Sequence, residues 1–167
     1  MLELKPISRD AIPQALVKAE RYRLLNEPAQ AESICLDVLA VDPSNQEARV
    51  LYILALTDQF GPHEPAVISR AEEAAAELDD EYARAYYAGI ICERRAAGQL
   101  AQGGHGSVET AHEWLKDALD CFDRAEALRP AGNDDALLRW NACVRMLERH
   151  PDPSGDDDRD SRLLMLE

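Results

Sequence analysis

The fold is decided by a pattern that occurs twice, in residues 31–43 (AESICLDVLAVDP) and in residues 118–130 (ALDCFDRAEALRP). In each stretch, an alanine is followed by a packing residue four positions later, a small or branched residue seven positions later and a proline twelve positions later. The residues are Ala31, Cys35, Val38 and Pro43 in the first stretch, and Ala118, Phe122, Ala125 and Pro130 in the second. The first three share one face of a helix, which the proline then ends. Such recurrence is typical of repeat proteins, whose units bury their cores against one another.

The spacing resembles that of the tetratricopeptide repeat, a helix–turn–helix unit of roughly 34 residues. The resemblance covers about residues 10–149. It implies an all-α fold, a right-handed superhelical stack of about three helix pairs followed by a C-terminal capping helix. We therefore expect one helical repeat domain over residues 1–150 and a disordered acidic tail over residues 151–167.

The expected helix pairs lie in residues 10–42, 44–80 and 82–130, and the last helix begins at Asn133 or Asp134. Ser44 and Glu47 have the spacing of a capping box, so Ser44 is the expected cap of the third helix. The third pair contains about 17 extra residues, which predict an insertion at about residues 97–110. We expect residues 98–106 to form a flexible loop, with part of the extra length taken up by longer helices.

The net charge of −14 restricts the expected partners. A field of this sign repels phosphate backbones and anionic lipids, so neither nucleic acid nor a membrane surface is expected. The acidity either serves solubility or indicates a basic partner. No apolar stretch is long enough to span a bilayer, and the N-terminus does not resemble a signal peptide. These features predict a cytoplasmic protein.

No motif in the sequence indicates catalysis. The four cysteines form no C-x-x-C pair and no histidine stands at ligand spacing from them, so we expect core thiols and no metal site. Cys35, Cys92 and Cys143 are the three expected to be buried. The glycine-rich residues 98–106 lack the lysine of a phosphate-binding loop. We therefore predict no catalytic, cofactor-binding or metal-binding residues, and a protein that is not an enzyme.

The resemblance implies a binding surface, because the first helices of successive tetratricopeptide units line a concave groove. An apolar stripe rimmed by charges would suit an amphipathic helix or an extended peptide. The residues carried over by register are Leu16, Glu20, Arg23 and Leu24, then Val50, Leu54, Thr57 and Asp58, then Tyr86, Ile90, Glu93 and Arg94, and finally Leu137, Asn141 and Arg145.

The predicted function is a non-enzymatic interaction module or adaptor that binds a protein or peptide partner. Family members that hold the acidic tails of chaperones use lysines and an asparagine in the groove. Leu16 and Glu20 occupy the first two of these places, so that function is not expected. The alternatives are a structural homo-oligomer, a secretion-type chaperone, and a small-ligand or enzymatic protein that uses residues 98–112.

Overall fold

The computed structural model describes residues 1–61 and 65–153, and within them the chain is all-α with seven α-helices. A short 3₁₀ turn, η1 (Arg9–Ala11), precedes them. The helices are α1 (Ile12–Leu24), α2 (Pro28–Val41), α3 (Gln46–Thr57), α4 (Pro65–Ala76), α5 (Glu81–Gln102), α6 (Ser107–Leu128) and α7 (Asp135–Arg149). The chain divides into two compact units, Met1–Arg84 and Ala85–Glu167, and each is described by itself.

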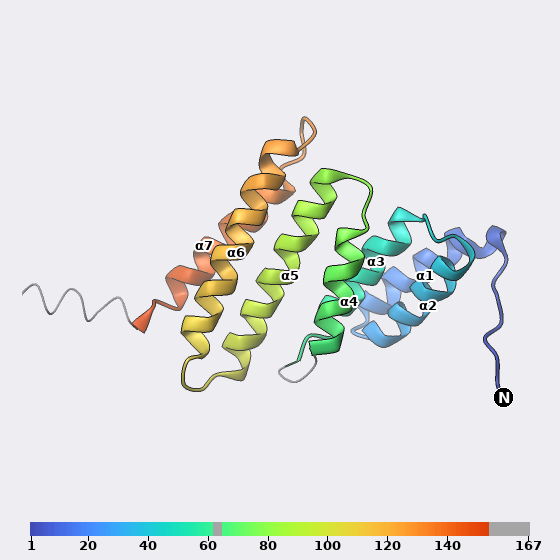
Figure 1. Cartoon of the computed structure of the whole chain (residues 1–167), viewed down its shortest axis with the longest axis horizontal. Helices are drawn as coiled ribbons and strands as arrows, with labels where there is room; N and C mark the ends of the chain where they lie inside the picture. The colour runs from blue at the N-terminus through green and yellow to red at the C-terminus, as the bar shows by residue number, and fades with distance from the viewer. Residues whose placement is uncertain (62–64, 154–167) are drawn as a thin grey trace, which may run out of the picture. The chain divides into compact units, whose positions relative to one another are not determined.

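In the first unit, α1 packs against α2, α2 against α3 and α3 against α4 (Figure 1). Ala19, Ala31 and Ala48 are fully buried where these helices meet. Because alanine occupies little volume, the helix axes can lie close together. Helices that are not consecutive also touch: α1 contacts α3, and Arg70 of α4 forms an ion pair with Glu32 of α2.

In the second unit, α6 lies between α5 and α7 along the chain and packs against both. Phe122 of α6 is fully buried, and the centroid of its ring lies 5.9 Å from that of Tyr86 of α5. Farther along the same helix pair, the guanidinium carbon of Arg95 lies 3.4 Å from the centroid of the Trp114 ring. α7 packs against α6, and its Arg139 reaches Glu93 of α5.

The expected end of α2 is confirmed, because the helix runs from Pro28 to Val41 and so ends just before Pro43. The expected cap of α3 is wrong by one residue. The Asn45 side-chain oxygen, not that of Ser44, accepts the backbone N–H of Ala48 at 2.9 Å. The Ser44 hydroxyl instead donates to Asp42, at 3.1 Å, so it is occupied outside the helix.

The predicted loop over residues 98–106 is wrong for most of its length. α5 continues to Gln102 and α6 begins at Ser107, so only residues 103–106 connect the two helices. Gly103, Gly104 and Gly106 in this turn have positive φ. The extra residues lengthen both helices, and the positions that flank them are packed, since Ala96, Ala111 and Leu115 are fully buried.

Residues 154–167 lie outside the described part of the chain, and with them most of the predicted acidic tail. Among the helices that the structure describes, none is both long enough and apolar enough to cross a bilayer. α5 and α6 each have 22 residues, but both carry many charged side chains.

Two glycines of α5 test the packing of α5 against α6. A methyl group added at Gly89 would lie 2.6 Å from a ring carbon of the buried Phe122, whereas one added at Gly98 would meet nothing within 4 Å. We predict that Gly89→Ala lowers the free energy of unfolding by about 1–3 kcal/mol through overpacking. Gly98→Ala should raise it by up to about 1 kcal/mol, because alanine favours the helix. Urea unfolding of both variants measures this difference, and equal stabilities would contradict the close packing.

Candidate functional site

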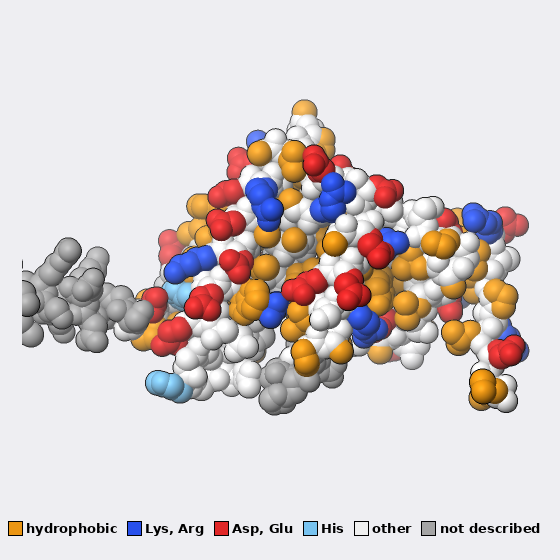
Figure 2. Space-filling model, in the orientation of Figure 1, with side chains coloured by type: hydrophobic (Ala, Val, Ile, Leu, Met, Phe, Trp, Pro, Cys, Tyr) orange, Lys and Arg blue, Asp and Glu red, His pale blue; other side chains and the backbone are white. Residues whose placement is uncertain are grey.

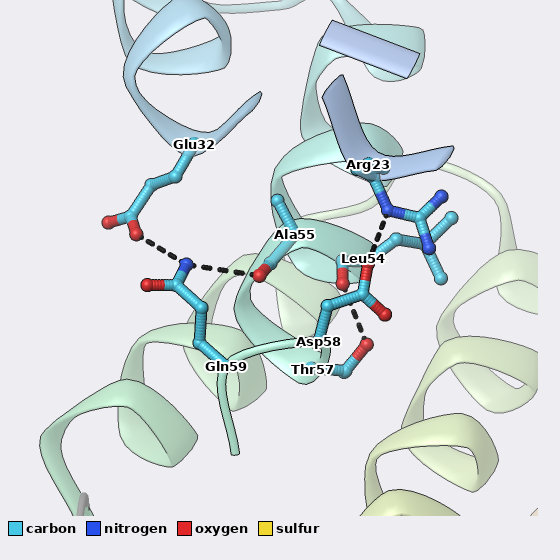
Figure 3. Close-up of polar contacts among 7 residues, drawn as sticks. All are labelled: Arg23, Glu32, Leu54, Ala55, Thr57, Asp58 and Gln59. Atoms are coloured by element: carbon cyan, nitrogen blue, oxygen red, sulfur yellow. Dashed lines mark hydrogen bonds and ion pairs between the residues drawn. The ribbon is translucent and has the colours of Figure 1, made fainter. Parts of the chain in front are cut away.

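An ion pair joins the C-terminal ends of α1 and α3. Arg23, in the last turn of α1, donates from Nε to the Asp58 carboxylate at 2.8 Å, and Asp58 is the C-cap residue of α3 (Figure 3). Their side chains are 18% and 20% exposed, so the pair lies at the edge of the unit, neither in its core nor fully in solvent. The pair brings one turn of α1 beside one turn of α3.

Further polar contacts hold the same end of α3. The Gln59 side-chain amide donates to the Glu32 carboxylate of α2 at 2.7 Å and to the carbonyl oxygen of Ala55 at 3.0 Å (Figure 3). The Thr57 hydroxyl donates to the carbonyl oxygen of Leu54 at 2.8 Å. The end of α3 is therefore tied to both α1 and α2 by side chains.

The Arg23–Asp58 pair places two rows of side chains next to each other. Val50, Leu54 and Asp58 lie on successive turns of α3, and Glu20 and Leu24 lie one turn apart on α1. Leu24 is 81% exposed, Glu20 is exposed, and Val50 and Leu54 are half-buried. We call this surface the α1–α3 face and define it by six residues: Glu20, Arg23, Leu24, Val50, Leu54 and Asp58.

The second unit contains a buried ion pair. Glu93 is only 7% exposed, and its carboxylate oxygens lie 3.3 and 3.4 Å from one guanidinium nitrogen of Arg139. Burial raises the pKa of Glu93, whereas the positive charges of Arg139 and Arg94 act in the opposite direction. The carboxylate therefore depends on Arg139 to remain charged inside the unit.

A hollow of about 280 Å³ lies between α6 and α7. Its lining combines two carboxylates, an indole, a leucine and an amide: Asp123, Glu126, Trp140, Leu137 and Asn141. Leu137 and Asn141 are two of the residues predicted to face a partner. The hollow has room for a side chain.

The predicted groove residues fall into three classes of exposure. The exposed ones are Glu20, Leu24, Asn141 and Arg145; the half-buried ones are Arg23, Val50, Leu54, Asp58, Tyr86, Arg94 and Leu137; the buried ones are Leu16, Thr57, Ile90 and Glu93. The buried residues pack inside their units instead of facing a partner. Leu16, for example, lies one turn after Ile12 and one turn before Ala19, both of which are buried in the same core.

Sequence reasoning did not find the partner of Glu93. A carboxylate that the helical pattern places on a buried face needs a cation beside it, so the sequence does indicate that Glu93 has a basic partner. α7, however, carries Arg139, Arg145 and Arg149, and the sequence alone does not distinguish among them.

Cysteine burial differs from the expectation at one position. Cys35, Cys121 and Cys143 are buried and Cys92 is half-buried, so Cys121 replaces Cys92 among the three buried thiols. Burial raises the pKa of Cys35 and of Cys143 to about 12. Both thiols are therefore unreactive near neutral pH.

The region proposed for an alternative ligand or enzymatic site is mainly helical. His112 is buried, and its Nε2 contacts the carbonyl oxygen of His150. Within residues 1–61 and 65–153, no three histidine, cysteine or carboxylate side chains are grouped so that they could hold a metal ion.

Comparisons of the chain with protein-family models, with curated proteins and with solved structures find no match.

The buried ion pair predicts a pH-dependent loss of stability in Arg139→Ala. At pH 7.5, removal of Arg139 should cost about 3 kcal/mol, because it leaves a buried carboxylate without its partner. A carboxyl group with a raised folded-state pKa keeps its proton at pH values where the unfolded chain has lost it. The loss of stability that this buried charge causes is therefore complete at high pH. It disappears as the pH falls toward about 4.3, the pKa of a glutamate in the unfolded chain.

Chemical denaturation of Arg139→Ala at pH 7.5 and at pH 5 should thus show a smaller deficit at the lower pH. Arg145→Ala is the matched control, since Arg145 is exposed on the same helix. It should change stability by less than about 0.5 kcal/mol. A pH-independent deficit for Arg139→Ala would contradict the role of the Glu93 carboxylate.

Proposed function

We propose that this chain is a non-enzymatic protein-interaction module that binds a peptide or helix of a partner protein. The observation that carries the proposal is the α1–α3 face. Leu24 is 81% exposed on α1, Val50 and Leu54 are half-buried on α3, and the Arg23–Asp58 ion pair joins the two helices next to Leu24 and one turn after Leu54. An apolar row flanked by charges matches the recognition of an amphipathic helix or an extended peptide.

The contacts between alternate helices support a repeat architecture as part of this proposal. α1 contacts α3, Arg70 of α4 pairs with Glu32 of α2, and Arg139 of α7 pairs with Glu93 of α5. Side-by-side first helices are what the tetratricopeptide resemblance implies. We therefore propose a tetratricopeptide-like stack in which the α1–α3 face forms part of the binding surface.

Charge favours a partner segment that carries basic residues beside its apolar ones. The chain has a net charge of −14, and Glu20 is exposed next to Leu24. Complementary charge accelerates encounter and selects the partner, while the apolar side chains supply most of the affinity. The proposed ligand is thus an apolar and basic helix or peptide.

The test is affinity capture from the native cell with the full-length chain and three variants. Leu24→Asp and Leu54→Asp change the α1–α3 face. Leu36→Asp is the matched control, because Leu36 is 45% exposed on α2, outside that face. Each face variant should weaken binding of the captured protein by about tenfold or more, on the scale of a lost interface anchor. Leu36→Asp should bind as the wild type does.

Two outcomes would overturn the proposal. One is equal capture by the wild type and both face variants. The other is a wild-type chain that is a stable dimer in solution and becomes monomeric in Leu24→Asp or Leu54→Asp, since the face would then serve self-association. Light scattering on the same samples measures the mass.

A further inference from the structure

The α5–α6 helix pair brings together two cysteines that are distant in the sequence. Cys92 of α5 and Cys121 of α6 lie close enough for each thiol to shift the pKa of the other. The contact follows from the packing around Gly89, where the absence of a side chain lets the Phe122 ring approach the backbone of α5. Cys92 lies three residues after Gly89, and Cys121 immediately precedes Phe122.

The sulfur of Cys121 has a second neighbour and a route to solvent. Arg124, one turn farther along α6, donates from a guanidinium nitrogen to the Cys121 sulfur at 3.2 Å. Cys121 is 8% exposed, but it borders an open hollow of about 560 Å³. The rest of the lining consists of Arg124 and three carboxylates: Asp117, Asp120 and Asp123. A small molecule in this hollow can therefore reach a sulfur that already has a cationic hydrogen-bond donor.

We propose that Cys92 and Cys121 form a peroxide-reactive dithiol site, in which Cys121 attacks the peroxide and Cys92 then closes a reversible disulfide between α5 and α6. This site lies in the second unit and does not depend on the α1–α3 face.

The environments of the two thiols assign these roles. The pKa of Cys121 is lowered because the Cys92 thiol and the Arg124 guanidinium donate hydrogen bonds to its sulfur, although burial and the charge of Asp117 oppose this. The pKa of Cys92 is raised by the same thiol contact and by burial, against a small opposing effect of Arg95. The thiolate is the nucleophilic form of cysteine, so Cys121 reacts first.

The reaction balances with hydrogen peroxide as the oxidant. The Cys121 thiolate attacks one peroxide oxygen, the O–O bond breaks, and the leaving hydroxide takes up a proton to form water. Cys121 is then a sulfenic acid. The Cys92 sulfur attacks the Cys121 sulfur, the S–O bond breaks, and the departing hydroxide leaves as water with the proton from Cys92. Two thiols are oxidised to one disulfide, and one peroxide is reduced to two waters.

The charge around the hollow selects neutral oxidants. Asp117, Asp120 and Asp123 are exposed, and Figure 2 shows acidic side chains along α6. An anionic disulfide such as oxidised glutathione is repelled by this surface, whereas hydrogen peroxide carries no charge. We therefore expect peroxide to oxidise the pair at least about tenfold faster than oxidised glutathione at the same concentration.

The first test uses the reduced full-length protein. It is treated with hydrogen peroxide, its remaining thiols are blocked with N-ethylmaleimide, and its peptides are mapped by mass spectrometry. We expect a disulfide that links Cys92 to Cys121, its reversal by dithiothreitol, and unmodified Cys35 and Cys143. Free Cys92 and Cys121 after oxidation, or earlier loss of Cys35 and Cys143, would overturn the proposal without the need for any variant.

The second test separates the two roles by substitution. Cys121→Ser should slow peroxide-dependent thiol loss at least about tenfold, because the raised pKa of the half-buried Cys92 keeps the thiol that remains at the site protonated. Cys92→Ser should still react but stop at the sulfenic acid, which dimedone traps on Cys121. Cys35→Ser is the control and should oxidise as the wild type does. If the effects of Cys92→Ser and Cys121→Ser are exchanged, the assigned roles are wrong.

The third test concerns Arg124 as a positioning residue. The pH midpoint for alkylation of Cys121 by iodoacetamide should lie below the usual thiol value of about 8.5 in the wild type. Arg124→Gln should move this midpoint upward, because it removes a donor to the thiolate. Lys116→Gln removes the same charge from an exposed position of α6 and should leave the midpoint unchanged. Equal midpoints in the wild type and Arg124→Gln would overturn the role of Arg124.

Discussion

Close contact between neighbouring helices is the constraint on which the other features of this chain depend. In the first unit, fully buried alanines stand where the helices meet, among them Ala19, Ala31 and Ala48. In the second unit, Gly89 has the same effect, because any side chain there would collide with the Phe122 ring. Side chains so small contribute little apolar area themselves, but they allow the larger residues around them to interdigitate at the density of a protein interior. The thiol contact between α5 and α6 and the ion pairs between alternate helices require this closeness.

Ion pairs join alternate helices in both units, but burial gives them different consequences. Arg23 and Asp58 lie at the edge of the first unit, where water screens the charges and the pair contributes about 0–1 kcal/mol. The pair joins the C-terminal end of α1 to that of α3, so that the surface around it includes the exposed Leu24 and the half-buried Leu54. Glu93 is buried in the second unit, so loss of Arg139 would leave a charge that water does not solvate. The first pair organises a surface, and the second constrains a core.

The sequence by itself determined the secondary structure to a large extent. Prolines and alanines are local signals, because a proline restricts its own backbone and an alanine marks the face of a helix that must pack closely. The end of α2 before Pro43 and the burial of Ala31 and Ala118 follow from such signals. Part of the candidate site followed in the same way, since the register places Leu24 and Leu54 on the first helices of successive pairs.

The tertiary structure decided which distant side chains meet. Helical periodicity indicates which face of a helix is buried but not which helix covers that face. It therefore did not identify Arg139 as the partner of Glu93. It also predicted that Cys92 is buried, whereas Cys121 is the buried thiol and Cys92 is half-buried. Glycine content predicted a loop near Gly98, yet α5 continues to Gln102, beyond the contact of its Arg95 with Trp114 of α6. These outcomes depend on contacts between residues far apart in the chain. Such contacts arise from the packing of whole helices, and no local stretch of sequence specifies them.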